Sequence, residues 1–400
     1  MNHRHGPGTP STRHCAPNVS FRNKASLAAL AALVLIAVVV AWPRSRPHVE
    51  RAPVPQAFVR ADIRRIDVHV HVPPQLAEHA VSLLRAQGVV LALNASGGEP
   101  NGGGLEESVA ASVATGGALR PYCSIDWSRV EEPEFVAYAN AALDLCREEG
   151  AVGLKIYKAL GLGYELSDGS LLGVDDPRLD PVFEHAGLLG LPVLIHTGDP
   201  QAFFRPPTPE NERFAELSAH PRWSFWGARR NGLPWPSWQE VFDQFERRVA
   251  RHPGTRFLGA HFGNAPEEPE TVARMLEAYP NFYVETAARV PEMGRFPAAR
   301  MREIFTRFHD RILFGTDFQM GDRGAVVLGS SGREPDTESR IPFFFEATYR
   351  YFETADRGFA HPSPIQGDWT IDGIDLPRNV LEDFYAGNAE RLFHLELPDP

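Results

Sequence analysis

Short apolar runs alternate with helical patterns along residues 63–317, and this alternation constrains the fold more than any other feature of the sequence. Eight runs are typical of strands, at 63–71, 88–96, 120–126, 151–158, 191–197, 256–262, 281–287 and 311–317. Helical patterns lie between several of them, at 132–149, 180–189, 238–251, 269–279 and 297–308. Eight βα units over about 330 residues predict an α/β chain folded as a (β/α)8 TIM barrel. A doubly wound open sheet is the alternative, although the first βα turn lacks a Gly-rich phosphate loop.

Two connections are unusually long, at 201–236 after the fifth predicted strand and at 318–341 after the eighth. The first contains many aromatic and basic residues: Phe203, Phe204, Trp223, Phe225, Trp226, Trp235, Arg205, Arg213, Arg229 and Arg230. Long loops in a compact domain are usually functional, so we expect a folded lid here. A satellite hydrophobic core beneath the insertion explains the aromatic residues equally well.

The N-terminus differs from the rest of the chain. A polar, basic tail at 1–24 precedes residues 25–42, which are apolar and carry no charge. Eighteen such residues can span a membrane and exceed the usual apolar region of a secretory signal. We therefore expect one N-terminal hydrophobic helix that anchors the chain, with a cleaved signal segment as the alternative. A Pro- and Arg-rich linker follows at 43–60, and the barrel domain at 61–397.

A signal-like segment followed by one long domain favours export of that domain, either anchored to the membrane or secreted after cleavage. Basic residues flank residues 25–42 on both sides, so charge does not settle the orientation. The net charge of -11 argues against nucleic acid as a partner. Three cysteines, Cys15, Cys123 and Cys146, are too few for a disulfide framework and lack the spacing of a thiolate metal site. We interpret them as core or tail residues.

The first predicted strand reads RIDVHVHV at residues 65–72. Alternation along a strand places His69 and His71 on one face, together with Asp67, and the valines on the other. Other predicted strands also end in ligand-type residues, namely His196, His261 and Asp317. Because the strand ends of a barrel meet at one mouth, these side chains predict a metal site there.

A catalytic divalent metal needs imidazole and carboxylate ligands and an open position for water or substrate. Three neutral histidines and one aspartate leave the ion with a net positive charge, which favours hydroxide or an oxyanion in that position. Asp317 can accept the proton of the water, and His261 is better placed as a non-ligand acid or base. Asp67 is either a hydrogen-bond acceptor behind the ligands or a capping or core-polar residue.

The motifs IDVHVH, LIHTGD, GAHFGN and ILFGTD, with the closing YAGNAERLF at 385–393, resemble the amidohydrolase superfamily. The resemblance covers residues 63–393 and is strongest to the amidohydrolase-2 branch, which includes the aminocarboxymuconate-semialdehyde decarboxylase-like enzymes. It implies one metal ion, usually zinc and with manganese as an alternative, bound by His69, His71, His196 and Asp317. It also implies that His261 is the catalytic histidine.

Four further residues near strand ends have two interpretations each. Lys155 lies where binuclear members of the superfamily carry a carbamylated lysine, but this branch generally lacks that bridge. We therefore interpret Lys155 or Lys158 as an anion-binding or structural lysine. Glu285 and Arg289 can support the metal site and bind a substrate carboxylate, or simply form surface pairs.

The sequence thus predicts a metal-dependent hydrolase that attacks a carbonyl carbon of a small amide, lactone or ester with metal-activated water. Non-oxidative decarboxylation of an unsaturated or aromatic acid is the alternative reaction. An inactive, membrane-tethered binding module is the alternative of another class. An anionic or aromatic substrate fits the aromatic lid and its arginines, while its identity and the formation of a homodimer stay open.

Overall fold

The computed structural model describes residue 60 and residues 62–198, 200–321 and 325–396. The described residues all belong to one compact unit, residues 53–400. The expected helix at 25–42 lies outside the described residues. Within the described part of the chain, no helix combines the length and the apolar character needed to cross a membrane.

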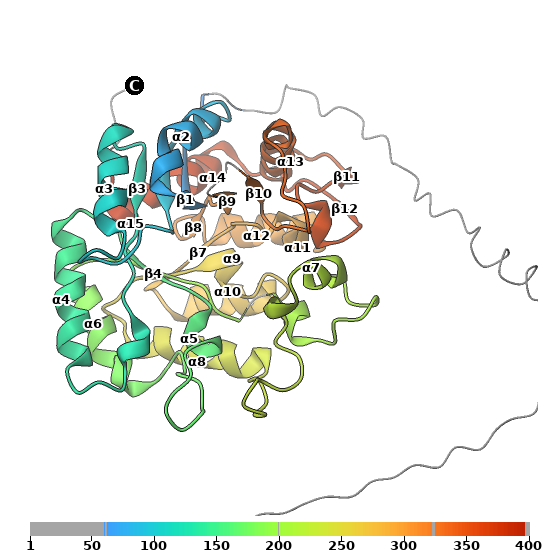
Figure 1. Cartoon of the computed structure of the whole chain (residues 1–400). Coiled ribbons are helices and arrows are strands. Elements are labelled where there is room, and N and C mark those ends of the chain that lie inside the picture. Colours follow the sequence, from blue (N-terminus) through green and yellow to red (C-terminus); the bar gives the residue numbers. More distant parts are fainter. Residues whose placement is uncertain (1–59, 61, 199, 322–324, 397–400) are drawn as a thin grey trace, which may run out of the picture. The chain divides into compact units, whose positions relative to one another are not determined.

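Two sheets of five strands each form the centre of this unit (Figure 1). Their orders are β10-β9-β1-β2-β3 and β4-β5-β6-β7-β8. The strands are β1 (Arg65–His71), β2 (Val89–Asn94), β3 (Leu119–Pro121), β4 (Leu154–Ile156), β5 (Val193–Ile195), β6 (Phe257–Gly259), β7 (Phe282–Glu285), β8 (Ile312–Leu313), β9 (Phe318–Met320) and β10 (Val326–Leu328). All neighbours from β1 to β8 within each sheet pair in parallel. A small antiparallel pair, β11 (Phe359–Ala360) and β12 (Thr370–Ile371), lies apart from them.

The two sheets are also hydrogen-bonded to each other at both edges. At one edge, β8 pairs with β7 of its own sheet. The chain continues directly into β9, which pairs with β1 of the other sheet. At the other edge Cys123 forms an isolated parallel bridge with Leu154 of β4.

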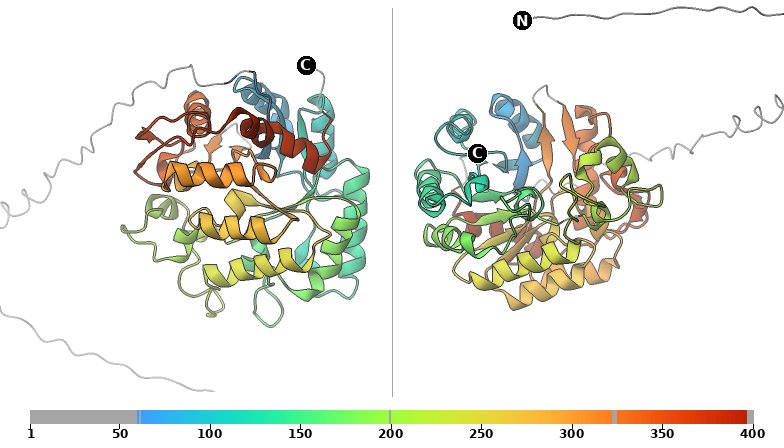
Figure 2. Two further views of the ribbon diagram at one scale, coloured as in Figure 1. Left: turned by 180° about the vertical axis from the view of Figure 1, so that it is seen from behind. Right: turned by 60° about the horizontal axis from the view of Figure 1, so that its bottom comes forward.

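Helices cover the outside of the strands, and α8, α10 and α12 lie side by side in Figure 2. The longer helices are α2 (Ala77–Arg85), α3 (Leu105–Ala114), α4 (Phe135–Glu148), α6 (Asp180–Leu188), α8 (Trp238–Arg251), α10 (Pro269–Ala278), α12 (Ala298–Arg307) and α13 (Ile341–Glu353). The shorter ones are α5 (Ala159–Leu162), α7 (Phe214–Ala219), α9 (Ala260–Gly263), α11 (Val290–Met293), α14 (Arg378–Glu382) and α15 (Asn388–Phe393). Helix α8 has the bounds expected from the sequence because Ser237 and Glu240 form a capping box at its start.

The first strand departs from the expected alternation. Its pairing with β2 shifts register between Asp67 and Val70, which marks an irregularity. Val68 packs in a cluster with strand residues such as Leu194, whereas Val70 and Val72 belong to the other core cluster. Asp67, Val68 and the histidines therefore do not follow one strict two-residue period, and the expectation of one valine face was wrong.

Cys123 and Cys146 are buried, as expected for core residues. They also form a disulfide, which the sequence interpretation did not include. The bond joins the segment after β3 to α4, the helix that follows it. Sequence spacing does not indicate this pairing, because 22 residues separate the two cysteines and the packing of α4 brings them together.

Candidate metal centre

Three side chains from β1 and the end of the eighth strand segment converge on one point. The Nε2 atoms of His69 and His71 are 3.2 Å apart. Oδ1 of Asp317 lies 3.6 Å from Nε2 of His71 and 4.0 Å from Nε2 of His69. Ligand atoms at such separations can surround a single ion at bond lengths of about 2.1 Å. The predicted meeting of His69, His71 and Asp317 is therefore observed.

The far nitrogen of each imidazole has its own partner. Nδ1 of His69 lies 2.9 Å from Oε1 of Glu285, and Nδ1 of His71 lies 2.6 Å from Oγ of Ser96. Such contacts fix the orientation of a ligating ring and leave Nε2 for the metal. The donor set therefore fits a divalent cation on the geometry of these residues alone. Ser96 was missed by the sequence interpretation, although its place just after β2 follows the same strand-end rule.

Glu285, the last residue of β7, connects two parts of the site. Its side chain is fully buried, and its Oε1 also accepts a hydrogen bond from the backbone N–H of His261 at 2.8 Å. Its Oε2 accepts a hydrogen bond from the backbone N–H of Ala287. Burial raises the pKa of Glu285 to about 7, against the lowering effect of these two donors. Glu285 thus supports the site, as one of its two interpretations proposed.

His261 and His196 form a second pair beside the three-residue cluster. Nε2 of His261 lies 3.2 Å from Nδ1 of His196, and Nδ1 of His261 contacts the carbonyl oxygen of Ala287 at 2.8 Å. The ring centres of His261 and His69 are 5.1 Å apart. His196 does not join His69, His71 and Asp317 in the candidate ligand group, so its ligand role stays a prediction.

Three of the strands end before the site residues that follow them. Strands β5, β6 and β8 stop at Ile195, Gly259 and Leu313, so they are shorter than the sequence pattern indicated. Beyond them His261 has φ 54° and Asp317 has φ 60°, a left-handed conformation that is uncommon outside glycine. Backbone strain of this kind clusters at functional sites, where the surrounding contacts hold it.

Asp317 and Asp67 lie in different surroundings although both are buried carboxyl groups. Burial raises the pKa of each to about 7, and nearby Arg289 and Lys155 oppose this shift in the pKa of Asp317. Asp67 accepts hydrogen bonds from the side chain and the backbone of Thr316. It also accepts a hydrogen bond from the backbone N–H of His69, so it links β1 to the segment before Asp317, and both interpretations of Asp67 stay open.

Lys155 on β4 is 1% exposed, and its Nζ lies 3.1 Å from Nε2 of His69. An ammonium and a divalent ion repel each other at short range. Metal binding therefore requires the Lys155 side chain to turn away or to lose its charge. Lys158 lies further out, with its Nζ 4.9 Å from the ring centre of Phe203.

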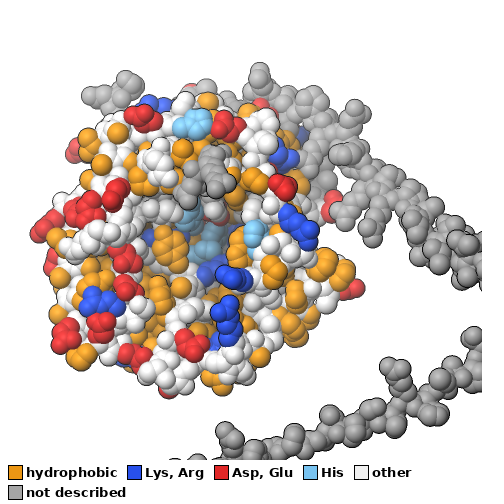
Figure 3. Space-filling view, viewed as in Figure 1, with side chains coloured by type: hydrophobic (Ala, Val, Ile, Leu, Met, Phe, Trp, Pro, Cys, Tyr) orange, Lys and Arg blue, Asp and Glu red, His pale blue; other side chains and the backbone are white. Residues whose placement is uncertain are grey.

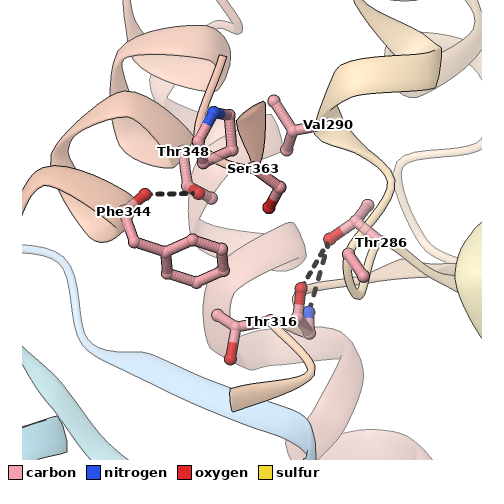
Figure 4. Close-up of a pocket in the computed structure, with 9 residues that line it drawn as sticks. Thr286, Val290, Thr316, Phe344, Thr348 and Ser363 are labelled. Carbon is pink, nitrogen blue, oxygen red and sulfur yellow. Dashed lines mark hydrogen bonds between the residues drawn. The ribbon is translucent and has the colours of Figure 1, made fainter. Parts of the chain in front are cut away.

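Figure 3 shows histidine side chains in a hollow near the middle of this face, with Lys and Arg side chains beside them. A separate small cavity is lined by Thr286, Thr316, Thr348, Ser363 and five other residues (Figure 4). None of the candidate ligands lines this cavity. Its threonine and serine hydroxyls bond to backbone carbonyls or to Asp67, so we assign it no chemistry.

Solved structures similar to this chain share 12–15% of its sequence. A TIM-barrel protein from Bordetella bronchiseptica has 15% identity and a TM-score of 0.47, over 83% of this chain and 99% of that chain. A 4-oxalomesaconate hydratase from Rhodopseudomonas palustris has 13% identity and a TM-score of 0.47, over 82% and 95%. A putative 2-pyrone-4,6-dicarboxylic acid hydrolase from Pseudomonas putida has 14% identity and a TM-score of 0.44, over 84% and 99%.

No sequence among the curated proteins matches this chain. A family model does match it, over residues 66–395, and its description is amidohydrolase. The match begins next to the two histidines of β1 and includes every candidate site residue described above. The resemblance noted in the sequence is thereby confirmed, and the chain belongs to the amidohydrolase-2 family.

Proposed function

We propose that this chain is a metal-dependent hydrolase that attacks the carbonyl carbon of a small amide, lactone or ester, on a closed (β/α)8 barrel. The convergence of Nε2 of His69, Nε2 of His71 and Oδ1 of Asp317 is the observation that carries the proposal. His196 is proposed as a further ligand, and zinc as the ion, with manganese as the alternative. When bound, the ion supplies Lewis acidity, which lowers the pKa of water and polarises a carbonyl.

The protein side chains supply the proton transfers. Asp317 is positioned to take the proton of the attacking water, because its carboxylate lies at the cluster. The Nδ1–H of His261 donates to the carbonyl of Ala287, so Nε2, which lies 3.2 Å from Nδ1 of His196, is the nitrogen that takes up a proton and, in the protonated ring, donates it to the substrate oxygen. Glu285 keeps His69 and the backbone of His261 in place while this happens.

Decarboxylation is the second candidate, and one observation favours it. Lys155 and Arg289 are 1% and 5% exposed, and both cations act on the pKa of Asp317. Buried cations beside the site suit a substrate carboxylate. Hydrolysis would create a new carboxylate, whereas decarboxylation would release carbon dioxide, so product analysis separates the two reactions.

The test begins with metal content. The chain is expressed with zinc or manganese supplied, purified, and analysed for bound metal and for turnover of lactones, N-acyl amino acids and hydroxybenzoates. We expect about one equivalent of metal and hydrolysis of one of the first two substrate classes. Less than about a tenth of an equivalent would instead support the inactive binding module.

We also propose that the domain is exported and held to the membrane by residues 25–42, with secretion after cleavage as the alternative. The buried disulfide between Cys123 and Cys146 supports export, because such bonds persist in oxidising compartments. Digestion of intact cells by an added protease would leave the chain whole if the domain stays inside.

A further inference from the structure

The insertion at 201–236 exposes large apolar side chains. Seven such side chains are exposed in the described part of the chain, and four of them lie in this insertion. They are Phe214, Trp223, Trp226 and Leu233, with exposed fractions of 36%, 37%, 54% and 43%. We call these four residues the apolar patch. Four large apolar side chains exposed within one short insertion indicate an interaction site.

The apolar patch lies in a segment that is held in place by its own contacts. Trp223 stacks on His220 with ring centres 3.9 Å apart, and His220 in turn contacts Oγ of Ser331 at 3.0 Å. The backbone N–H of Arg229 donates to the carbonyl of Leu233, and its guanidinium donates to the carbonyl of Gly169. These contacts hold the tip of the insertion while Trp226 and Leu233 face water.

A buried ion network fixes the base of the same insertion. Arg213, 1% exposed, pairs with Glu216 of α7 and with Glu292 of α11. Ser330, from the connection after β10, donates to Glu216. The insertion is therefore tied to two other connections, and it presents the apolar patch as a rigid surface.

Within the insertion itself the exposed cations outnumber the exposed anions, while the neighbouring segment adds the exposed Asp168 and Glu165, the latter 3.7 Å from Arg229. Between residues 205 and 234 the exposed charged side chains are Arg205, Arg222, Arg230 and Glu210. This stretch therefore exposes three cations and one anion, whereas the net charge of the whole chain is -11. Tryptophan, leucine and arginine together are typical of surfaces that lie at a membrane–water interface.

The sequence outside the described residues also indicates a membrane as the partner. Residues 25–42 are apolar and uncharged, and the linker at 43–60 can extend to about 60 Å. A domain joined to a bilayer by such a linker meets the lipid surface constantly. The linker then gives the lipid surface a high effective concentration near the domain, so even a weak second contact between the domain and the lipid can form.

We propose that the apolar patch docks onto the surface of an anionic lipid bilayer, with Trp226 and Leu233 entering the interface and Arg222 and Arg230 contacting lipid headgroups. The insertion follows β5, the strand that leads to His196, so docking would hold the opening of the site beside the membrane. The proposal goes beyond the proposed hydrolase and does not require the anchor, because the whole patch lies within residues 53–400.

The test uses residues 53–400, so that residues 25–42 cannot contribute to binding. All residues of both hydrophobic core clusters lie at or after Ile63, so this chain keeps the whole described core. Flotation with vesicles of equal parts phosphatidylcholine and phosphatidylglycerol is compared with flotation on phosphatidylcholine alone. The variant Trp226→Ser with Leu233→Ser is compared with a matched control, Leu188→Ser with Val113→Ser, whose exposed residues lie on α6 and α3.

We expect the parent and the control to bind the anionic vesicles and the patch variant to bind at least about tenfold less. Binding should also weaken in about 1 M NaCl, where the Debye length is about 3 Å. Equal binding by the patch variant and the control would overturn the proposal, as would an absence of binding by the parent. A parent dimer that dissociates in the patch variant would overturn it too, because a second copy would then cover the patch. Metal content is measured on the same samples, so a failure of the hydrolase proposal is seen separately.

Discussion

Oε1 of Glu285 lies 2.9 Å from Nδ1 of His69 and 2.8 Å from the backbone nitrogen of His261. One buried carboxylate from β7 therefore orients a candidate metal ligand of β1 and also the backbone of the proposed acid or base after β6. The second contact matters because His261 has a left-handed backbone, which needs support from its surroundings. Ligand geometry and the position of the proton donor thus depend on the same side chain.

Replacement of Glu285 by Gln should weaken metal binding by about 10- to 100-fold. A glutamine oxygen can replace only one of the two carboxylate oxygens, so its amide N–H group would face either the N–H of Ala287 or the N–H groups of His69 and His261. Titration with Co²⁺, followed by its absorption spectrum, measures the affinity. Glu246→Gln is the control, since Glu246 pairs with Arg274 and Tyr279 away from the site. Equal affinities for the two variants would contradict this role for Glu285.

Replacement of His261 by Asn should lower turnover by about 10² or more while metal content stays near normal. Asparagine tolerates the left-handed backbone at this position, and its side chain can still donate a hydrogen bond to the carbonyl of Ala287. Loss of the imidazole should therefore remove the proton transfer without unfolding the site. His185→Asn, at a histidine that contacts Asp144 on the helices, serves as the control. Unchanged turnover in His261→Asn would remove this residue from the mechanism.

The sequence was sufficient to predict the order of strands and helices and the meeting of His69, His71 and Asp317. Periodicity reports which side chains are buried, and parallel strands must bring their ends to one edge, so both predictions follow from local patterns. Helices were located to within about three residues for the same reason, as α8 and α10 illustrate.

Tertiary contacts explain what the sequence could not supply. The contact of Ser96 with His71 joins the turn after β2 to β1, and the approach of Lys155 to His69 joins β4 to β1. The irregularity in β1 depends on its pairing with β2, which alternation along a single strand does not reveal. Backbone conformation at Asp317 is likewise set by its hydrogen bond to the carbonyl of His69.

Loss of the disulfide should destabilise the domain without changing the metal site. Cys123 and Cys146 are 23 residues apart in sequence, and closing a loop of this length is worth about 3 kcal/mol in the unfolded chain. Paired replacement by Ser should therefore lower the free energy of unfolding by about that amount, measured by urea denaturation. Metal content of the folded fraction is the internal control. An unchanged denaturation midpoint, or free thiols at both positions in the parent, would contradict the expectation.

Metal affinity should fall as the pH is lowered through about 7. Burial raises the pKa of Asp317 to about 7 in the metal-free chain, so below that pH its carboxyl group carries a proton. A ligand carboxylate must be ionised, and the free protein then holds one more proton than the metal-bound protein. Acid therefore favours the metal-free state, by about tenfold in affinity for each pH unit below 7 and each proton released.

His71 should add nothing to this pH dependence. Its burial, together with the nearby His69 and Lys155, holds the pKa of His71 well below its usual range, so its ring is already neutral at pH 7. Calorimetric titration with Zn²⁺ in two buffers of different ionisation enthalpy counts the protons released at each pH. We expect release that is substantial near pH 6 and small near pH 8. An affinity that is flat across this range would show that Asp317 is ionised before the metal binds, and that neighbouring Arg289 and Lys155 outweigh its burial.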